Sequence, residues 1–219
     1  MTIQKQSWLI PAIAASLLLA CTEFRSNYWI GRGDASRSSG RHADALAAYA
    51  RATEADPSSS KAWLRLGNEC LETGDSPKAA AALEQAVRYD PNLYEAWYNL
   101  AVARLHSMSP DTAATALDRA IALKPEEGDA WFLMCTAKGS QGDWVTALTK
   151  CDKAVRLSPA NKEARAMLAF LYLYLTQERK IAQDPAIAGL IDEDARAVAQ
   201  RALAAKSISD SVAILNAPQ

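Results

Sequence analysis

Apolar positions recur along this chain with a fixed spacing of 34 residues. Tryptophan, proline and alanine each form columns with this step, and all columns share one register. The tryptophans are Trp29, Trp63, Trp97 and Trp131, and the prolines are Pro57, Pro91, Pro125 and Pro159. Two alanine columns are Ala45, Ala79, Ala113 and Ala147, and Ala52, Ala86, Ala120 and Ala154. A period of this length predicts stacked repeats rather than one globular core.

Residues that start or end helices divide each period into two helices. Gly74 can end a first helix, and Ser76 followed by Pro77 is typical of an N-cap with proline at the first helical position. Ser109 and Pro110 repeat this arrangement one period later. The proline column then stops each second helix, because proline cannot continue the hydrogen-bond ladder. The sequence therefore predicts antiparallel helix pairs and no strands.

The period and its columns resemble the tetratricopeptide repeat (TPR), and the fullest copy runs from Ser60 to Pro91. The resemblance implies an all-α fold, a right-handed α-solenoid of helix-turn-helix repeats closed by a C-terminal capping helix. It predicts four repeats, at residues 26–59, 60–93, 94–127 and 128–159.

Both ends of the array depart from the pattern. Gly31, Gly33 and the serine-rich stretch from Ser36 to Gly40 predict that the first helix of repeat 26–59 is short, frayed or partly unfolded. Residues 160–219 are expected to form a fifth TPR-like helix and C-terminal capping helices, which cover the last exposed apolar face. The alternative is that the C-terminal helix folds back into the concave groove.

The first twenty residues have a targeting pattern. A polar start with Lys5 precedes an apolar run from Trp8 to Ala20, which is typical of a secretory signal. The run closes Leu18-Leu19-Ala20-Cys21, which resembles the lipobox of bacterial lipoproteins. The resemblance implies that residues 1–20 are a signal peptide, that Cys21 is acylated, and that residues 21–25 form the anchor segment. Thr22 favours an outer-membrane lipoprotein facing the periplasm; the alternative is an ordinary secreted protein.

Composition and motifs argue against several classes of function. With 24 basic and 25 acidic side chains, the chain lacks the positive charge of a nucleic-acid-binding protein. His42 and His106 lie in different repeats and in no metal-ligand motif, no two cysteines have CxxC spacing, and no glycine-rich phosphate loop follows a strand. We expect no enzyme, no cofactor and no metal site.

Cys135 and Cys151 occupy positions 8 and 24 of their repeat. In an antiparallel helix pair that turns near Gly142, these positions face each other. Two readings stay open: a disulfide, which an oxidising periplasm would allow, or two small buried apolar side chains. Cys70 has no evident partner and is expected to be packed.

The TPR resemblance implies that the first helices line a concave groove that binds a protein partner. Its predicted lining residues are Leu64, Arg65, Asn68, Tyr98, Asn99, Val102, Phe132, Leu133, Thr136, Met167 and Phe170. We expect an apolar, aromatic centre facing solvent. Asn68 and Asn99 should stand on adjacent helices, where their amides can bind the main chain of an extended peptide.

Chaperone-binding TPR proteins clamp a C-terminal carboxylate with two such asparagines and several basic residues. Here Leu64, Asp129 and Leu133 occupy the basic places, so this clamp is absent. The groove should instead prefer an apolar helix or an extended segment of a partner protein.

These observations favour a non-catalytic, lipid-anchored scaffold that faces the periplasm and serves an envelope machine. This architecture resembles small TPR lipoproteins that assist pilus assembly. A secretion system is another envelope machine that such a scaffold could serve. The alternatives are a TPR adaptor for peptidoglycan synthesis or cell division, and a soluble cytoplasmic TPR adaptor. The oligomeric state is not fixed by the sequence.

Overall fold

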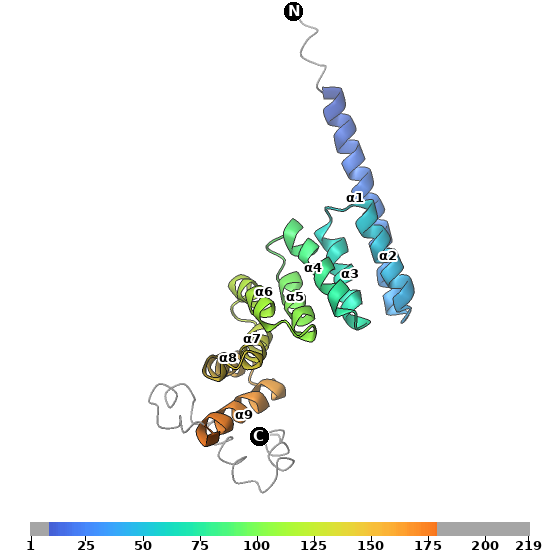
Figure 1. The fold of residues 1–219 in the computed structure, drawn as a ribbon. Helices are drawn as coiled ribbons and strands as arrows, with labels where there is room; N and C mark the ends of the chain where they lie inside the picture. Colours follow the sequence, from blue (N-terminus) through green and yellow to red (C-terminus); the bar gives the residue numbers. More distant parts are fainter. Residues whose placement is uncertain (1–8, 179–219) are drawn as a thin grey trace, which may run out of the picture. The chain divides into compact units, whose positions relative to one another are not determined.

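The computed structural model describes residues 9–178, which form nine α-helices and no strand (Figure 1). The first helices of the pairs are α1 (Leu9–Ser38), α3 (Ser60–Glu72), α5 (Tyr94–His106) and α7 (Gly128–Ser140), followed by α9 (Lys162–Glu178). The second helices are α2 (His42–Ala55), α4 (Ser76–Tyr89), α6 (Pro110–Leu123) and α8 (Trp144–Leu157). From α2 on, equivalent helices begin 34 residues apart, as the columns indicate. The all-α TPR prediction is confirmed, whereas the predicted C-terminal capping helices lie outside the described residues.

The turn inside each helix pair uses one repeated backbone position. Gly40, Gly74 and Gly142 adopt positive φ angles of 69°, 79° and 77°. Met108 occupies the same position in the α5–α6 turn, with φ of 56°. Glycine reaches this left-handed region without a steric penalty, whereas a residue with a Cβ pays for it. The turn therefore forms in all four pairs, but in the α5–α6 pair it strains the backbone at Met108.

The start of α4 differs by one residue from the prediction. Asp75, rather than Ser76, is its N-cap, and the Asp75 Oδ1 accepts a hydrogen bond from the Lys78 backbone N–H at 3.2 Å. A carboxylate satisfies an unpaired N–H at this position as well as a hydroxyl does, so Ser76 becomes the first helical residue. At α6 the predicted arrangement holds, with Ser109 as N-cap followed by Pro110.

The two helices of a pair meet where a small residue faces a large one. A Cβ added to Gly67 of α3 would lie 2.5 Å from Cγ of Leu83 on α4. One period earlier, Gly33 of α1 packs in the same way against the ring of Tyr49 on α2. These glycines let the helix axes approach closely, and each large partner is fully buried.

The prediction of a short or frayed first helix in repeat 26–59 is wrong. Helix α1 runs without interruption from Leu9 to Ser38. Ser26, Ile30, Gly33 and Ser36 form its buried face. Glycine and serine weaken an isolated helix, but here their small size permits packing on α2, and tertiary packing outweighs intrinsic propensity.

The chain divides after Ala103 into two compact units. In the first unit, Ile30, Ala52 and Ala62 form a buried cluster against which Trp29 packs. The second unit has its own cluster, contributed by α7, α8 and α9: Cys135, Ala147, Leu148, Cys151, Leu168, Leu171 and Leu175. No helix in the described part of the chain has the length and apolar character needed to span a membrane.

Candidate functional site

In the first unit, α3 and α5 present a chain of hydrogen-bonded amides. The Asn99 Nδ2 donates to the Asn68 Oδ1 at 2.8 Å, and the Asn68 Nδ2 donates to the Glu95 Oε1 at 2.9 Å. Both asparagines are half-buried, whereas Glu95 is exposed. An amide has two N–H donors and two acceptor sites, so these bonds orient each group without exhausting it. The side chains of Asn68 and Asn99 are therefore held in fixed orientations.

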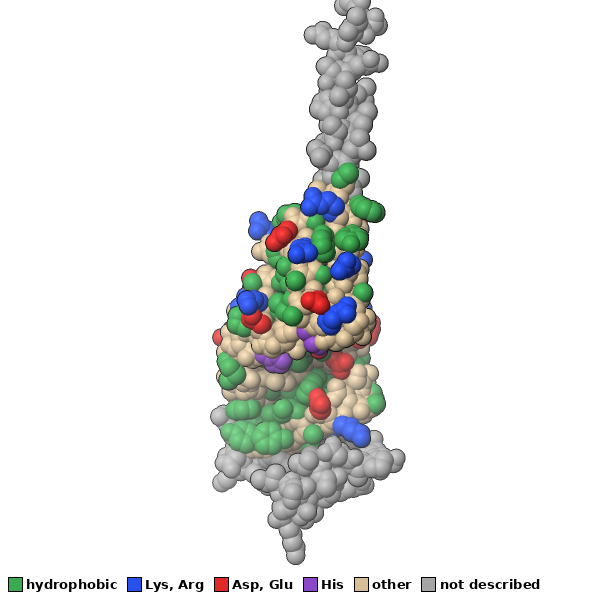
Figure 2. Space-filling model, turned by 90° about the vertical axis from the view of Figure 1, so that its right-hand side faces the viewer, with side chains coloured by type: hydrophobic (Ala, Val, Ile, Leu, Met, Phe, Trp, Pro, Cys, Tyr) green, Lys and Arg blue, Asp and Glu red, His purple; other side chains and the backbone are tan. Residues whose placement is uncertain are grey.

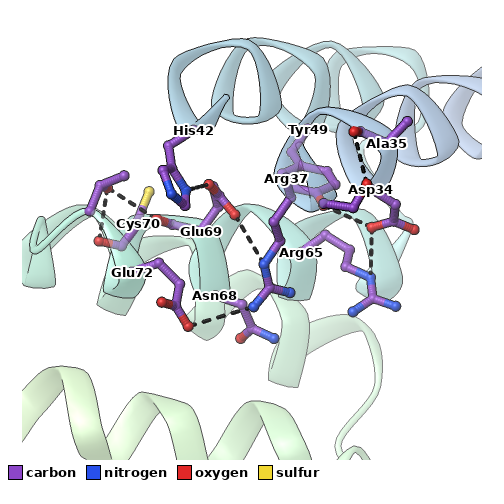
Figure 3. A network of polar contacts seen from close by, with 12 residues as sticks. Asp34, Ala35, Arg37, His42, Tyr49, Arg65, Asn68, Glu69, Cys70 and Glu72 are labelled. Atoms are coloured by element: carbon purple, nitrogen blue, oxygen red, sulfur yellow. Dashed lines mark hydrogen bonds and ion pairs between the residues drawn. The ribbon is translucent and has the colours of Figure 1, made fainter. Parts of the chain in front are cut away.

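A buried carboxylate links α1, α2 and α3 next to these amides. Glu69 is fully buried, and its Oε1 forms a hydrogen bond of 2.7 Å with the His42 Nδ1. The Arg37 Nε lies 3.5 Å from the Glu69 Oε2, and the Arg37 Nη2 lies 3.5 Å from the Glu72 Oε1. Figure 3 shows Arg37 extending from α1 between the two glutamates of α3. A buried charge requires such partners, so the network fixes the packing of these three helices.

A second polar cluster also joins α1, α2 and α3, through Asp34, Tyr49 and Arg65. The Tyr49 hydroxyl donates to the Asp34 Oδ1 at 2.7 Å, and the Arg65 Nε lies 3.5 Å from the same oxygen. Burial raises the pKa of Tyr49 above its ordinary value, and the hydrogen bond to Asp34 raises it further. Arg65, a predicted groove residue, is thus held by a carboxylate, with a third of its side chain exposed.

The predicted apolar centre is only partly exposed in the first unit. Leu64 is only 5% exposed, so the prediction that it faces solvent is wrong. Its apolar side chain gains more from burial within the unit than from lining a groove. Tyr98 and Val102 of α5 are half-buried, and the Tyr98 ring stacks on Tyr94 with centroids 5.9 Å apart.

The predicted groove residues of the second unit divide into packed and exposed members. Phe132 and Met167 pack against the α7–α9 cluster, so they too contribute to the core. Leu133 and Thr136 are half-buried, and the Thr136 hydroxyl donates to the Phe132 carbonyl at 3.1 Å. Phe170 is 55% exposed and stacks on Tyr174 with centroids 6.2 Å apart. Phe170 is therefore the best-placed apolar anchor in this unit.

Cys135 and Cys151 are joined by a disulfide that ties α7 to α8, with an S–S distance of 2.05 Å. Both side chains are buried, and they lie two periods after the Gly67–Leu83 contact. The remaining cysteines are free, Cys21 exposed and Cys70 buried. Burial raises the pKa of the Cys70 thiol.

Sequence reasoning missed the buried Glu69 network, although a signal exists. Glu69 occupies the position that Ala103 and Ala137 occupy one and two periods later, and both alanines are fully buried. A carboxylate in a column of buried alanines indicates a buried polar contact. Its partner His42 could not be inferred, because their pairing depends on how α2 packs on α3.

Within residues 9–178, no group of three or more His, Cys, Asp or Glu side chains is arranged to hold a metal ion. The polar clusters described above consist of ion pairs, two amides and the hydrogen bonds of Tyr49 and His42 to carboxylates.

The sequence matches a known protein family. Residues 8–141 match the family model described as the cilia and flagella-associated protein 70 C-terminal domain, a TPR model. The chain belongs to this TPR-type family. The match covers more than half of the chain and includes α1, which supports its assignment as part of the repeat array. A search of curated proteins found no match.

Solved TPR structures have the same fold. A crystal structure of MamA is 25% identical, with a TM-score of 0.66, and the match covers 74% of this chain and 96% of that one. MamA from Desulfovibrio magneticus RS-1 is 17% identical, with a TM-score of 0.66 and coverage of 76% and 94%. YrrB, described as a TPR protein with an unusual peptide-binding site, is 21% identical, with a TM-score of 0.63 and coverage of 81% and 91%. TPR folds of this kind are typically non-catalytic interaction scaffolds.

Proposed function

We propose that this TPR protein is a non-catalytic scaffold that binds a protein partner on the face formed by its first helices α3 and α5. The observation that carries the proposal is the hydrogen-bonded chain from the Asn99 amide through the Asn68 amide to the Glu95 carboxylate. These groups lie on adjacent helices and are oriented before a partner arrives, which lowers the entropy lost on binding. The peptide-binding site named for YrrB supports the same use of the fold.

The contacts indicate what kind of segment this face recognises. An extended peptide would pair its main chain with the asparagine amides, and its charged side chains would meet Arg37, Arg65 and Glu72, each of which is partly exposed. The partner segment that this face of the first unit recognises is therefore polar and charged rather than purely apolar.

We further propose that Cys21 is acylated and anchors the protein in the outer membrane, facing the periplasm. The lipobox-like sequence and the exposure of Cys21 support this location. The Cys135–Cys151 disulfide also supports it, because disulfides persist in oxidising compartments. An anchored, non-catalytic scaffold suits the assembly of an envelope machine such as a pilus or a secretion system.

Site-specific crosslinking tests the binding face. A photo-crosslinking amino acid at Asn68 or Asn99, both in the first unit, should capture the same protein in living cells. The same probe at Arg88 or Arg119, which are exposed on the second helices α4 and α6, is the matched control. Capture from the control positions alone, or equal capture from all four, would overturn the proposed face.

The anchor has its own test. The wild-type protein should incorporate labelled palmitate and have the mass expected for cleavage before Cys21, whereas Cys21→Ser should do neither. Thiol titration of unacylated, denatured protein should find two free thiols, from Cys21 and Cys70. Three free thiols in acylated protein from the cell envelope would contradict an oxidising location, because the acylated Cys21 has no free thiol.

A further inference from the structure

One exposed face of α1 combines aromatic and basic side chains with the cysteine. Residues 21, 25, 28 and 32 are spaced by three or four positions, so they lie on one side of the helix. Phe24 lies on this side as well and is 75% exposed, while Tyr28 is 52% exposed. Cys21, Arg25 and Arg32 are also exposed. We call this set, Cys21, Phe24, Arg25, Tyr28 and Arg32, the α1 stripe.

The opposite side of α1 fixes the direction in which the stripe points. Ser26, Ile30, Gly33 and Ser36 are buried, and Gly33 packs against the ring of Tyr49 on α2. Rotating the helix to hide Phe24 and Tyr28 would expose this packed side. The exposure of the stripe is therefore a fixed property of the first unit.

A cavity of about 280 Å³ borders the stripe between α1 and α2. Its lining includes three arginines, Arg32, Arg41 and Arg51, but only one carboxylate, Asp44. The Arg41 Nε lies 3.3 Å from an Asp44 oxygen, which leaves the positive charges of Arg32 and Arg51 without a carboxylate of their own in the cavity lining. The Arg51 guanidinium lies 4.7 Å from the centroid of the Trp29 ring, which holds it at the cavity.

The positive charge of this face is local. Residues 21–55 as a whole carry five arginines and four carboxylates, so the excess of positive charge is confined to the stripe and the cavity lining. Figure 2 looks onto the described part of these two helices and shows Lys and Arg side chains interspersed with hydrophobic ones, with some Asp and Glu side chains among them. Arginine binds phosphate oxygens in a bidentate manner, and exposed aromatic residues favour the membrane–water interface.

We propose that the α1 stripe and the adjoining arginine cavity form a docking surface for anionic phospholipid. The proposal rests on the proposed anchor in one respect: an acyl chain on Cys21 would emerge from the same side of α1 as the stripe. Phe24 then enters the interface, Tyr28 lies among the headgroups, and Arg25, Arg32 and Arg51 contact phosphates. The first unit would thus lie against the membrane through α1. This contact would hold the polar side chains of α3 and α5 in a defined orientation to the membrane.

Vesicle sedimentation tests the surface without acylation. The full chain carrying Cys21→Ser is mixed at low salt with vesicles of phosphatidylcholine alone or with about one third phosphatidylglycerol, and the ratio of the two partition coefficients is measured. The ratio cancels any apolar contribution of residues 1–20, which both vesicle types share. We expect phosphatidylglycerol to raise partitioning about tenfold or more, and high salt to remove the increase.

Charge-matched variants identify the residues. Arg25→Gln, Arg32→Gln and Arg51→Gln combined should reduce the ratio to near one. The control combines Arg88→Gln, Arg119→Gln and Lys153→Gln, which remove the same charge from exposed positions on α4, α6 and α8. The control should retain the full ratio, and circular dichroism should show both variants to be helical.

The outcomes separate this inference from the anchor. An equal loss of the partition ratio in both variants would overturn the docking surface. No loss in the arginine variant would also overturn it, and these arginines would then be candidates for binding an acidic protein. Loss in the arginine variant alone supports the docking surface, even if palmitate labelling shows that Cys21 is not acylated. In that case the anchor fails while the membrane-facing surface stands.

Discussion

The indole Nε1 of Trp63 donates a hydrogen bond to the backbone carbonyl of Pro57 at 2.8 Å. The same bond joins Trp97 to Pro91 and Trp131 to Pro125, again at 2.8 Å. Tryptophan and proline are separate columns in the sequence, yet in these three repeats they are donor and acceptor of one contact. Proline ends the second helix, and tryptophan ties the following loop to the next first helix.

Replacing Trp63 by Phe should therefore lower the free energy of unfolding by more than the small loss of apolar area. The Nε1–H bond is removed while the ring system is largely kept, and one such bond contributes about 1 kcal/mol. Urea denaturation measures the loss, and Trp97→Phe and Trp131→Phe should show similar values. An unchanged midpoint in all three variants would mean that the bond is not made in solution.

Two glycines of α1 give a sharper test of its packing. Gly33→Ala should destabilise the protein by about 1–3 kcal/mol, because its Cβ would overlap the buried Tyr49 ring. Gly31→Ala is the matched control on the same helix, since a Cβ there meets nothing within 4 Å. Alanine should stabilise the helix at that position by about 1 kcal/mol. Equal effects in thermal melts would indicate that α1 does not pack on α2.

The repeat period made most of the fold predictable, because each column reports a constraint that recurs in every unit. The helix pairs, the glycine turns and the proline stops all follow from it. Helix propensity alone predicts the first helix wrongly. It does not include the packing of Ser26, Gly33 and Ser36 on a neighbouring helix, which stabilises α1.

The candidate site was less predictable. The repeat position of a residue predicts which helix face it occupies, but not whether that face is covered. The sequence therefore predicts Leu64 and Phe132 as groove residues, although Leu64 is buried and Phe132 packs on the core. It also predicts Asn68 and Asn99 on adjacent helices, as the structure has them, but their bond to each other depends on side-chain geometry. The Glu69–His42 contact joins residues 27 positions apart and breaks the column pattern.

Met108→Gly should stabilise the protein. Met108 is 87% exposed and has a φ angle of 56°, so it loses little packing on substitution and is relieved of a left-handed backbone conformation. The expected gain is about 1 kcal/mol, seen as a higher melting temperature. Gly142→Ala is the reverse change at the equivalent turn, and it should cost a similar amount. A destabilising Met108→Gly would contradict this account of the turn.

Tyr49 should make stability decline at alkaline pH. Burial and Asp34 raise the pKa of Tyr49 in the folded protein, while in the unfolded chain it ionises near its ordinary pKa of 10.0. Neutral Tyr49 therefore contributes its full stability below pH 10, and this contribution is lost as the pH rises further, by about 1.4 kcal/mol per pH unit. Tyr49→Phe should flatten that part of the curve. An equally steep decline in the variant would place the titrating group elsewhere.

The affinity of the crosslinked partner for a double variant, Asn68→Ala with Asn99→Ala, tests the proposed binding face most directly. Titration calorimetry should show binding at least about tenfold weaker than for the wild type, because about 1 kcal/mol is lost for each amide. Arg88→Ala with Arg119→Ala, on the second helices, should bind as the wild type does. Unchanged affinity in the asparagine variant, with its helical circular dichroism intact, would contradict the claim that the first-helix face holds the partner.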